Sequence, residues 1–149
     1  MLGSRFSKRC NAKSYNVSRN LQHRQTLKLQ RESLAAQNTI TSYGAGYIVV
    51  NQQRVDKSVI VLPERIIFDW GAKSFDALRA DHFAALLAME REVVLIGTGD
   101  RLRFPSAEIL RPLVEAGIGV EVMDVQAACR TYNILLSENR KVAAALLLG

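Results

Sequence analysis

The sequence predicts one α/β domain with three layers and a mixed central sheet, in which an antiparallel half precedes a β-α-β-α-β half. Short apolar runs bounded by Gly, Pro and Asn indicate strands. Helical periodicity then begins after Asp81, Ser106 and Asp124, residue types that cap helix N-termini. The chain has 149 residues, of which 48% are hydrophobic and 23% charged. This ordinary globular composition is sufficient for a buried core.

The first half of the domain reads as antiparallel strands. Residues 39–43 alternate in polarity, and Gly44-Ala45-Gly46 follows as a turn, which predicts a hairpin with residues 47–50. A second reversal at residues 51–53 leads to another apolar run, and Pro63 interrupts the chain before the next one. Four strands are therefore expected, over residues 39–43, 47–50, 58–62 and 65–70.

The second half alternates strands with helices. A helix over residues 82–90 would bury Phe83, Leu86 and Leu87, and a helix from Ser106 to Glu115 would bury Ile109, Leu110, Leu113 and Val114. A third helix follows Asp124, with Val125, Ala128, Cys129, Tyr132, Leu135 and Leu136 on one face. Strands are expected over residues 93–96, 118–123 and 142–148. The first two of these should be parallel, because a helix connects them.

The net charge of +6 is unevenly distributed. Residues 1–31 hold eight Lys or Arg and no acid, whereas residues 32–149 hold twelve bases and fourteen acids, a net charge of −2. Binding of nucleic acid requires a basic face on the fold itself. No nucleic-acid partner is therefore expected for the folded body.

Residues 1–31 are interpreted as a disordered basic tail, followed by a single domain over residues 32–149. The tail is rich in Ser, Asn, Gln, Arg and Lys and has few large apolar residues, so it cannot form a core. The leading interpretation is an unstructured extension, such as one translated from a start codon placed too far upstream. A mitochondrial transit peptide and a basic arm for nucleic acid or anionic lipid are the alternatives.

The cysteines and histidines predict no metal site and no cofactor. Cys10 and His23 lie in the tail, and Cys129 and His82 lie in the body on different segments. Cys129 falls on an apolar helix face, where a cysteine usually acts as a small buried hydrophobic residue. No positioned base, acid and nucleophile can be identified, so no catalytic residue is assigned.

The candidate ligand site is at the carboxyl ends of the parallel strands, which is where ligands usually bind in open α/β sheets. The loop after the strand over residues 93–96 carries glycine and arginine, and the helix after Asp124 carries an arginine and an asparagine on its polar face. Such a site would suit an anion. However, the glycine pattern is only half of a dinucleotide fingerprint, and tight-turn glycines are the alternative explanation. The candidate residues are Gly97, Thr98, Gly99, Arg101, Arg103, Arg130 and Asn133.

Several ordered motifs resemble one family. They are Tyr43-Gly44-Ala45-Gly46-Tyr47-Ile48, Leu62-Pro63, residues 94–99, Arg103-Phe104-Pro105, residues 116–124 and residues 127–135. Together they are similar to the family called domain of unknown function 498, the Mth-type domain, in its proteobacterial form. The resemblance covers about residues 34–149 and implies a three-layer fold with a mixed sheet. It supplies no catalytic residues.

The family includes a mitochondrial assembly factor of respiratory complex I, so the resemblance implies a protein that acts by protein contact. The leading hypothesis is therefore a non-catalytic binding or assembly factor for respiratory complex I or membrane-protein biogenesis. Its partner would be a protein, homo-oligomers are allowed, and no transmembrane segment is expected. Exposed aromatic residues among Tyr43, Tyr47, Trp70 and Phe104 would be its anchors. The alternative is a protein or enzyme that binds a small anion through the Gly-Thr-Gly loop and Arg130. The expected location is the bacterial cytoplasm, or the mitochondrial matrix if the source is eukaryotic.

Overall fold

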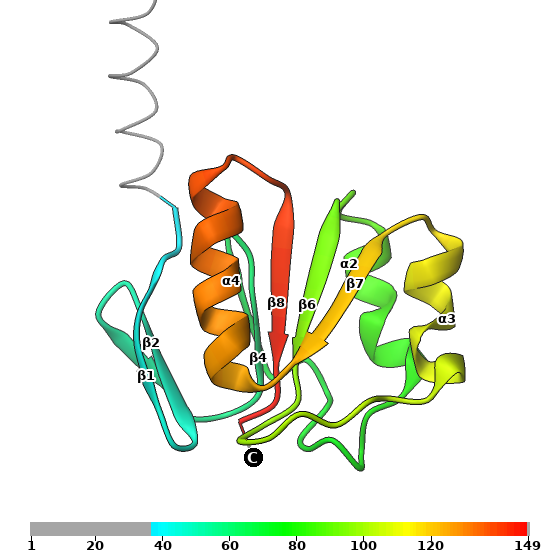
Figure 1. Ribbon diagram of the computed structural model, residues 1–149, viewed down its shortest axis with the longest axis horizontal. Coiled ribbons are helices and arrows are strands. Elements are labelled where there is room, and N and C mark those ends of the chain that lie inside the picture. The colour runs from blue at the N-terminus through cyan, green and yellow to red at the C-terminus, as the bar shows by residue number, and fades with distance from the viewer. Residues whose placement is uncertain (1–36, 149) are drawn as a thin grey trace, which may run out of the picture. The chain divides into compact units, whose positions relative to one another are not determined.

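A computed structural model describes residues 37–148, so the predicted basic tail lies outside the described residues. The central sheet has five strands in the order β5-β4-β8-β6-β7, and a second sheet has the order β1-β2-β3. Figure 1 shows β8, β6 and β7 side by side, with β1 and β2 on the other side of α4. The strands are β1 Ile40–Gly44, β2 Tyr47–Val50, β3 Gln53–Val55, β4 Val59–Val61, β5 Ile66–Phe68, β6 Val93–Gly97, β7 Gly119–Met123 and β8 Val142–Leu146. The helices are the 3₁₀ helix η1 Ala80–Phe83, α2 Ala84–Leu87, α3 Ala107–Glu115 and α4 Val125–Ser137.

The central sheet is mixed, as the sequence predicts. Strand β6 pairs in parallel with β7 on one side and with β8 on the other. Strand β4 pairs antiparallel with both β8 and β5. The expected parallel pair and the expected last strand are thus confirmed, although β8 ends at Leu146 and not at Leu148.

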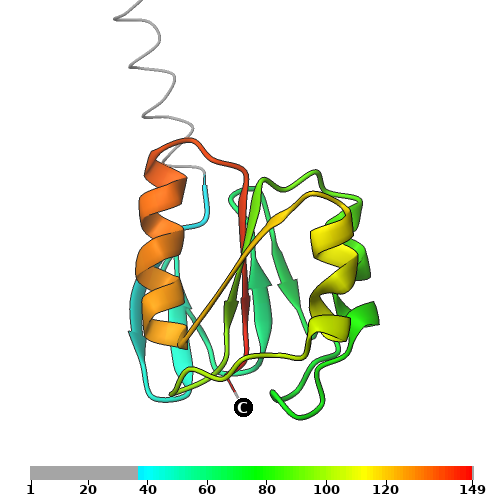
Figure 2. The ribbon, with the colours of Figure 1, turned by 45° about the vertical axis from the view of Figure 1, so that its right-hand side comes forward.

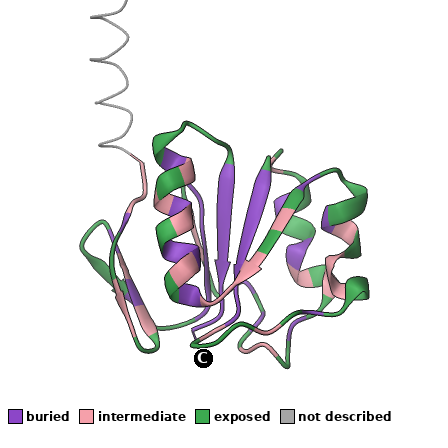
Figure 3. Cartoon of the chain, viewed as in Figure 1, coloured by how far each residue is buried: buried purple, intermediate pink, exposed green. Residues whose placement is uncertain are grey.

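Both faces of the central sheet are covered. Alternate residues of each inner strand enter opposite cores: Val93 and Leu95 of β6 belong to one cluster, and Val94 and Ile96 to the other. Helix α4 and the β1–β3 sheet pack on the first face, and η1, α2 and α3 pack on the second (Figure 2). The inner strands are buried along their length (Figure 3). Continuous apolar runs are typical of strands buried on both faces.

The predicted hairpin is present, but its strands form a sheet of their own. Strand β3 is added to it because the chain reverses at Asn51 and Gln52, which have φ values of 48° and 75°. Sequence reasoning missed β3 and took the reversal directly to β4. The Asn133 side chain of α4 holds β1 in place: its Oδ1 accepts from the Ile40 N–H at 3.1 Å, and its Nδ2 donates to the Ile40 carbonyl at 2.7 Å.

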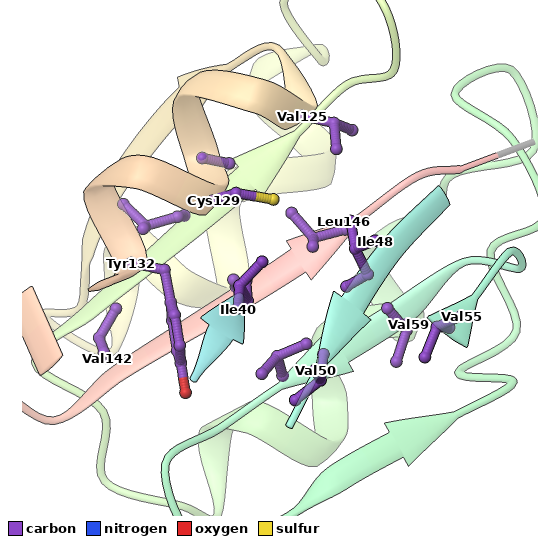
Figure 4. Close-up of a cluster of buried hydrophobic side chains, with 14 of the residues drawn as sticks. Ile40, Ile48, Val50, Val55, Val59, Val125, Cys129, Tyr132, Val142 and Leu146 are labelled. Carbon is purple, nitrogen blue, oxygen red and sulfur yellow. The ribbon is translucent and has the colours of Figure 1, made fainter. Parts of the chain in front are cut away.

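Helix α4 provides the largest side chain in the core between the two sheets. Figure 4 shows Cys129 and Tyr132 pointing from α4 toward residues of both sheets. The Tyr132 hydroxyl donates to the Asn38 carbonyl at 2.8 Å. The helix starts where the sequence predicts, because Asp124 Oδ1 accepts from the Ala127 N–H at 2.8 Å.

Three details of the helix predictions were wrong. The element expected over residues 82–90 is a 3₁₀ turn followed by the four-residue α2, and it is preceded by Arg79 and not capped by Asp81. Leu87 is exposed on α2, and Val114 of α3 is 61% exposed. Both residues lie at the edge of the apolar face of their helix, on the side that is directed away from the sheet. The bounds of α3 agree with the prediction, and Gly117 follows it with a φ of +76°.

Candidate functional site

The loop after β6 begins at Gly97, where close packing favours a glycine. A Cβ atom at this position would lie 2.8 Å from Leu146 Cδ2, 3.2 Å from Val125 Cα and 3.3 Å from Ala128 Cβ. The first turn of α4 therefore approaches the end of β6 so closely that a side chain at position 97 would require neighbouring atoms to shift. This contact places the start of α4 beside the carboxyl ends of the central strands.

Thr98 closes the same loop. Its buried hydroxyl donates to the Arg101 carbonyl at 2.8 Å and accepts from the Arg103 N–H at 3.0 Å. The Thr98 N–H also donates to the Met123 carbonyl of β7. These bonds fix the loop conformation and use the hydrogen-bonding capacity of the side chain.

Gly99 borders a hollow of about 320 Å³ between this loop and the β1–β2 turn. Its φ is +108°, and its carbonyl accepts from the Val125 N–H at 2.9 Å. The hollow is also lined by the Gly44–Gly46 turn, Asp100, Gln126 and Leu147. Of the seven residues predicted for the site, Gly99 alone lines this hollow, and an acidic side chain forms part of its wall.

Two of the predicted site residues have other partners. Arg103 forms an ion pair with Asp76 at 3.0 Å, and its guanidinium lies 4.1 Å from the centre of the Phe75 ring. Asn133 holds β1, as described above. Neither residue lines the hollow.

Arg101 and Arg130 are the exposed cations of the predicted set. Arg130 donates from Nη1 to the Tyr43 hydroxyl at 3.3 Å, and this hydrogen bond raises the pKa of the guanidinium above its usual value. Tyr43 precedes Gly44, which lines the hollow, but neither Arg101 nor Arg130 is among the lining residues. Asp124 already occupies the amide-rich start of α4. An anion would therefore depend mainly on the two arginines.

The anion site stays a prediction, and phosphate titration followed by amide chemical shifts tests it. We expect saturable shifts at Gly99 and Arg101, with a preference for phosphate over an uncharged analogue of about 1–2 kcal/mol. Arg130→Ala should weaken these shifts, whereas Arg111→Ala on α3 should leave them unchanged. Shifts no larger than those of distant surface residues would contradict the prediction.

The described residues do not bring together a nucleophile and a base. Cys129 is fully buried, and burial raises the pKa of its thiol to about 12, so the reactive thiolate is suppressed at neutral pH. His82 Nδ1 accepts from the Arg79 N–H at 3.0 Å on the other face of the sheet. Within residues 37–148, no cluster of three or more His, Cys, Asp or Glu side chains forms a potential metal site.

The exposed apolar side chains of the loop over residues 98–105 are a further feature of this edge. Phe104 is 73% exposed and Leu102 is 48% exposed. The sequence placed Phe104 among four possible aromatic anchors, and the structure distinguishes them. Trp70 is buried, and Tyr43 and Tyr47 are half-buried. Leu102 carried no signal in the sequence, because it fits no periodic pattern.

A family model described as "Protein of unknown function (DUF498/DUF598)" matches residues 40–147. The chain belongs to this family. The resemblance inferred from the motifs is thereby confirmed, and it includes nearly all of the described fold. No helix within the described residues is long and apolar enough to cross a membrane.

Relatives of this chain with curated names include assembly factors. The bovine protein "NADH dehydrogenase [ubiquinone] 1 alpha subcomplex assembly factor 3" is 37% identical over 121 residues, which are 80% of this chain and 65% of the relative. The chain thus spans less than two thirds of that relative. A human protein of the same name is 35% identical over 80% of this chain.

Solved bacterial structures share the fold. A crystal structure from Bordetella parapertussis is 43% identical and has a TM-score of 0.71, with 75% of this chain and 96% of that chain covered. A Bordetella pertussis protein described as a Mth938-like domain is 36% identical, with a TM-score of 0.66 over 75% of this chain and 86% of that chain. These likenesses confirm the predicted α/β fold class.

Proposed function

We propose that this domain is a non-catalytic protein-binding module that assists the assembly of a membrane-bound NADH dehydrogenase. The observation that carries the proposal is an exposed aromatic side chain on a fixed loop. Phe104 lies between Arg103, which is held by Asp76 and by the Thr98 hydroxyl, and Pro105, which is buried. A preorganised aromatic residue loses little entropy on binding, which is typical of interface anchors.

Two further observations support this proposal. The relatives with curated names at 35–37% identity are named for an assembly role, which is a role of protein contact. In the described residues, the one thiol is buried and the one imidazole is hydrogen-bonded on the opposite face. The proposal requires the chain to act where the complex is assembled, in the bacterial cytoplasm or, in a eukaryotic cell, in the mitochondrial matrix.

The test is complementation in the source cell after deletion of the gene. Loss of the chain should lower the amount of fully assembled NADH dehydrogenase on a native gel, and the intact chain should restore it. Phe104→Ala should restore it poorly, because truncation of an interface anchor costs at least about 2 kcal/mol, or thirtyfold in affinity. Val114→Ala is the matched control, since it removes a similarly exposed apolar side chain on α3.

Equal rescue by both variants would show that Phe104 is not the anchor. An unchanged amount of assembled enzyme after deletion would contradict the assembly role itself. Both variants are first compared with the parent by thermal unfolding, so that any loss of rescue is not a loss of folding.

A further inference from the structure

A groove lies at the same end of the central sheet as the Gly97 loop but toward its β5 edge, between the ends of strands β3 and β5. Two hollows of about 510 Å³ and 180 Å³ share the connection over residues 56–58 and Asp69 as walls. The smaller hollow also reaches Arg54 and Val55 of β3 and Phe68 of β5. The larger one extends to Trp70, Ala72 and Lys73. We call this continuous depression the β3–β5 groove.

One residue that lines the groove carries a buried hydrogen-bond donor without an acceptor. Trp70, which lines it, is 9% exposed, and its ring packs against His82 and Phe83. Its Nε1 atom has no hydrogen-bond partner among the described residues. A buried unpaired donor costs about 1–3 kcal/mol, and native proteins rarely retain one without a reason. A ligand that supplied an acceptor would remove this cost.

Two sheet edges border the groove. Strand β3 pairs only with β2, and β5 pairs only with β4, so each has one side without a strand partner among the described residues. Phe68, the last residue of β5, is 51% exposed at this rim. Open edges are the places where an extended peptide adds to a sheet through main-chain hydrogen bonds.

The charges of the groove select the kind of ligand. Asp56, Lys57, Asp69 and Lys73 line it, and none of them forms an ion pair with another described residue. With Arg54 of the smaller hollow, three cationic side chains lie beside two carboxylates, so both signs of charge line the groove and a phosphate or a nucleic-acid backbone would meet repulsion as well as attraction. A polypeptide backbone, which offers donors and acceptors without net charge, matches this lining.

We propose that the β3–β5 groove binds an extended segment of a partner protein. A main-chain carbonyl of the segment accepts the Trp70 indole N–H, and one large apolar side chain packs against Phe68 and Ala72. The inference rests on the proposed protein-binding function and adds a second contact surface, distinct from the Phe104 loop.

The tryptophan itself provides the measurement, because the sequence contains only one. The full-length chain is titrated with blocked peptides Thr-Val-Thr-Phe-Thr-Val-Thr, in which the central residue is Phe, Ala or Asp. We expect a saturable change of the Trp70 emission with the Phe peptide. The affinity should be at least about tenfold lower with the Asp peptide, because a carboxylate cannot occupy the apolar wall.

Phe68→Lys should lower the affinity for the Phe peptide about tenfold, whereas Val114→Lys, at a similarly exposed position on α3, should leave it unchanged. If Phe68→Lys does not fold, amide chemical shifts of the unmodified chain decide the question. Shifts over residues 54–58 and 66–73 support the proposal. The absence of a saturable change up to about 1 mM peptide overturns it. Peptide-induced shifts confined to residues 98–105 also overturn it, but they leave the proposed function unaffected. The proposed function is likewise unaffected if the peptide titration fails while Phe104→Ala restores assembly poorly.

Discussion

Replacement of Tyr132 by alanine is expected to lower the free energy of unfolding by about 3–5 kcal/mol. Tyr132 is among the largest fully buried side chains and lies between α4, the β1–β3 sheet and the central sheet. Its removal leaves a cavity where three elements meet, and these elements cannot all move inward together. Chemical denaturation with urea measures the change, provided that the slope with denaturant stays the same.

The matched variant Tyr132→Phe separates packing from hydrogen bonding. It keeps the ring but leaves the Asn38 carbonyl without the Tyr132 hydroxyl, which now donates to it at 2.8 Å. The expected cost is about 1–2 kcal/mol. Ile134→Ala serves as the control on the same helix, because Ile134 is 57% exposed and its truncation should cost less than about 0.5 kcal/mol. A loss for Tyr132→Ala no greater than that for Tyr132→Phe would show that ring packing does not stabilise this core.

The sequence predicted those elements whose evidence is local. Strands β6 and β7 and the start of α4 are marked by short apolar runs, by Gly117 and by the Asp124 cap, and each of these signals acts within a few residues. Strand β3 was missed because it has three residues, two of them exposed, and therefore shows no apolar alternation. Its existence depends on the left-handed turn at Asn51 and Gln52, residue types that do not require such a conformation.

The place of the candidate residues at the edge of the sheet follows from the sequence, but the partners of their side chains do not. The rule for strand ends points to the edge of the sheet at which Gly99 borders a hollow. The role of Arg103 depends on Phe75 and Asp76, which lie 27 or 28 positions earlier in the chain and meet it only after folding. Asn133 likewise binds the backbone of Ile40, 93 residues away. Polar residues that share a helix face give no sign of whether they face a ligand or another segment of the same chain.

Substitution of Gly97 tests whether the glycine at this strand end is required for packing or for binding an anion. Gly97→Ala is expected to lower the free energy of unfolding by about 1–3 kcal/mol, and Gly97→Val by more. The new Cβ would lie 2.8 Å from Leu146 Cδ2, which can move, and 3.2 Å from Val125 Cα, which is backbone. The φ of Gly97 is not left-handed, so the cost would come from crowding alone.

A double-mutant cycle with Leu146→Ala tests the origin of that cost. Leu146→Ala removes the nearest obstructing atom, so Gly97→Ala should be less destabilising in this background, with a coupling free energy of at least about 0.5 kcal/mol. The rescue should be partial, because Val125 Cα stays in place. If Gly97 is required for its amide to approach an anion, the outcome differs. Gly97→Ala would then leave stability unchanged in both backgrounds and would abolish the phosphate-induced shifts at Gly99 and Arg101.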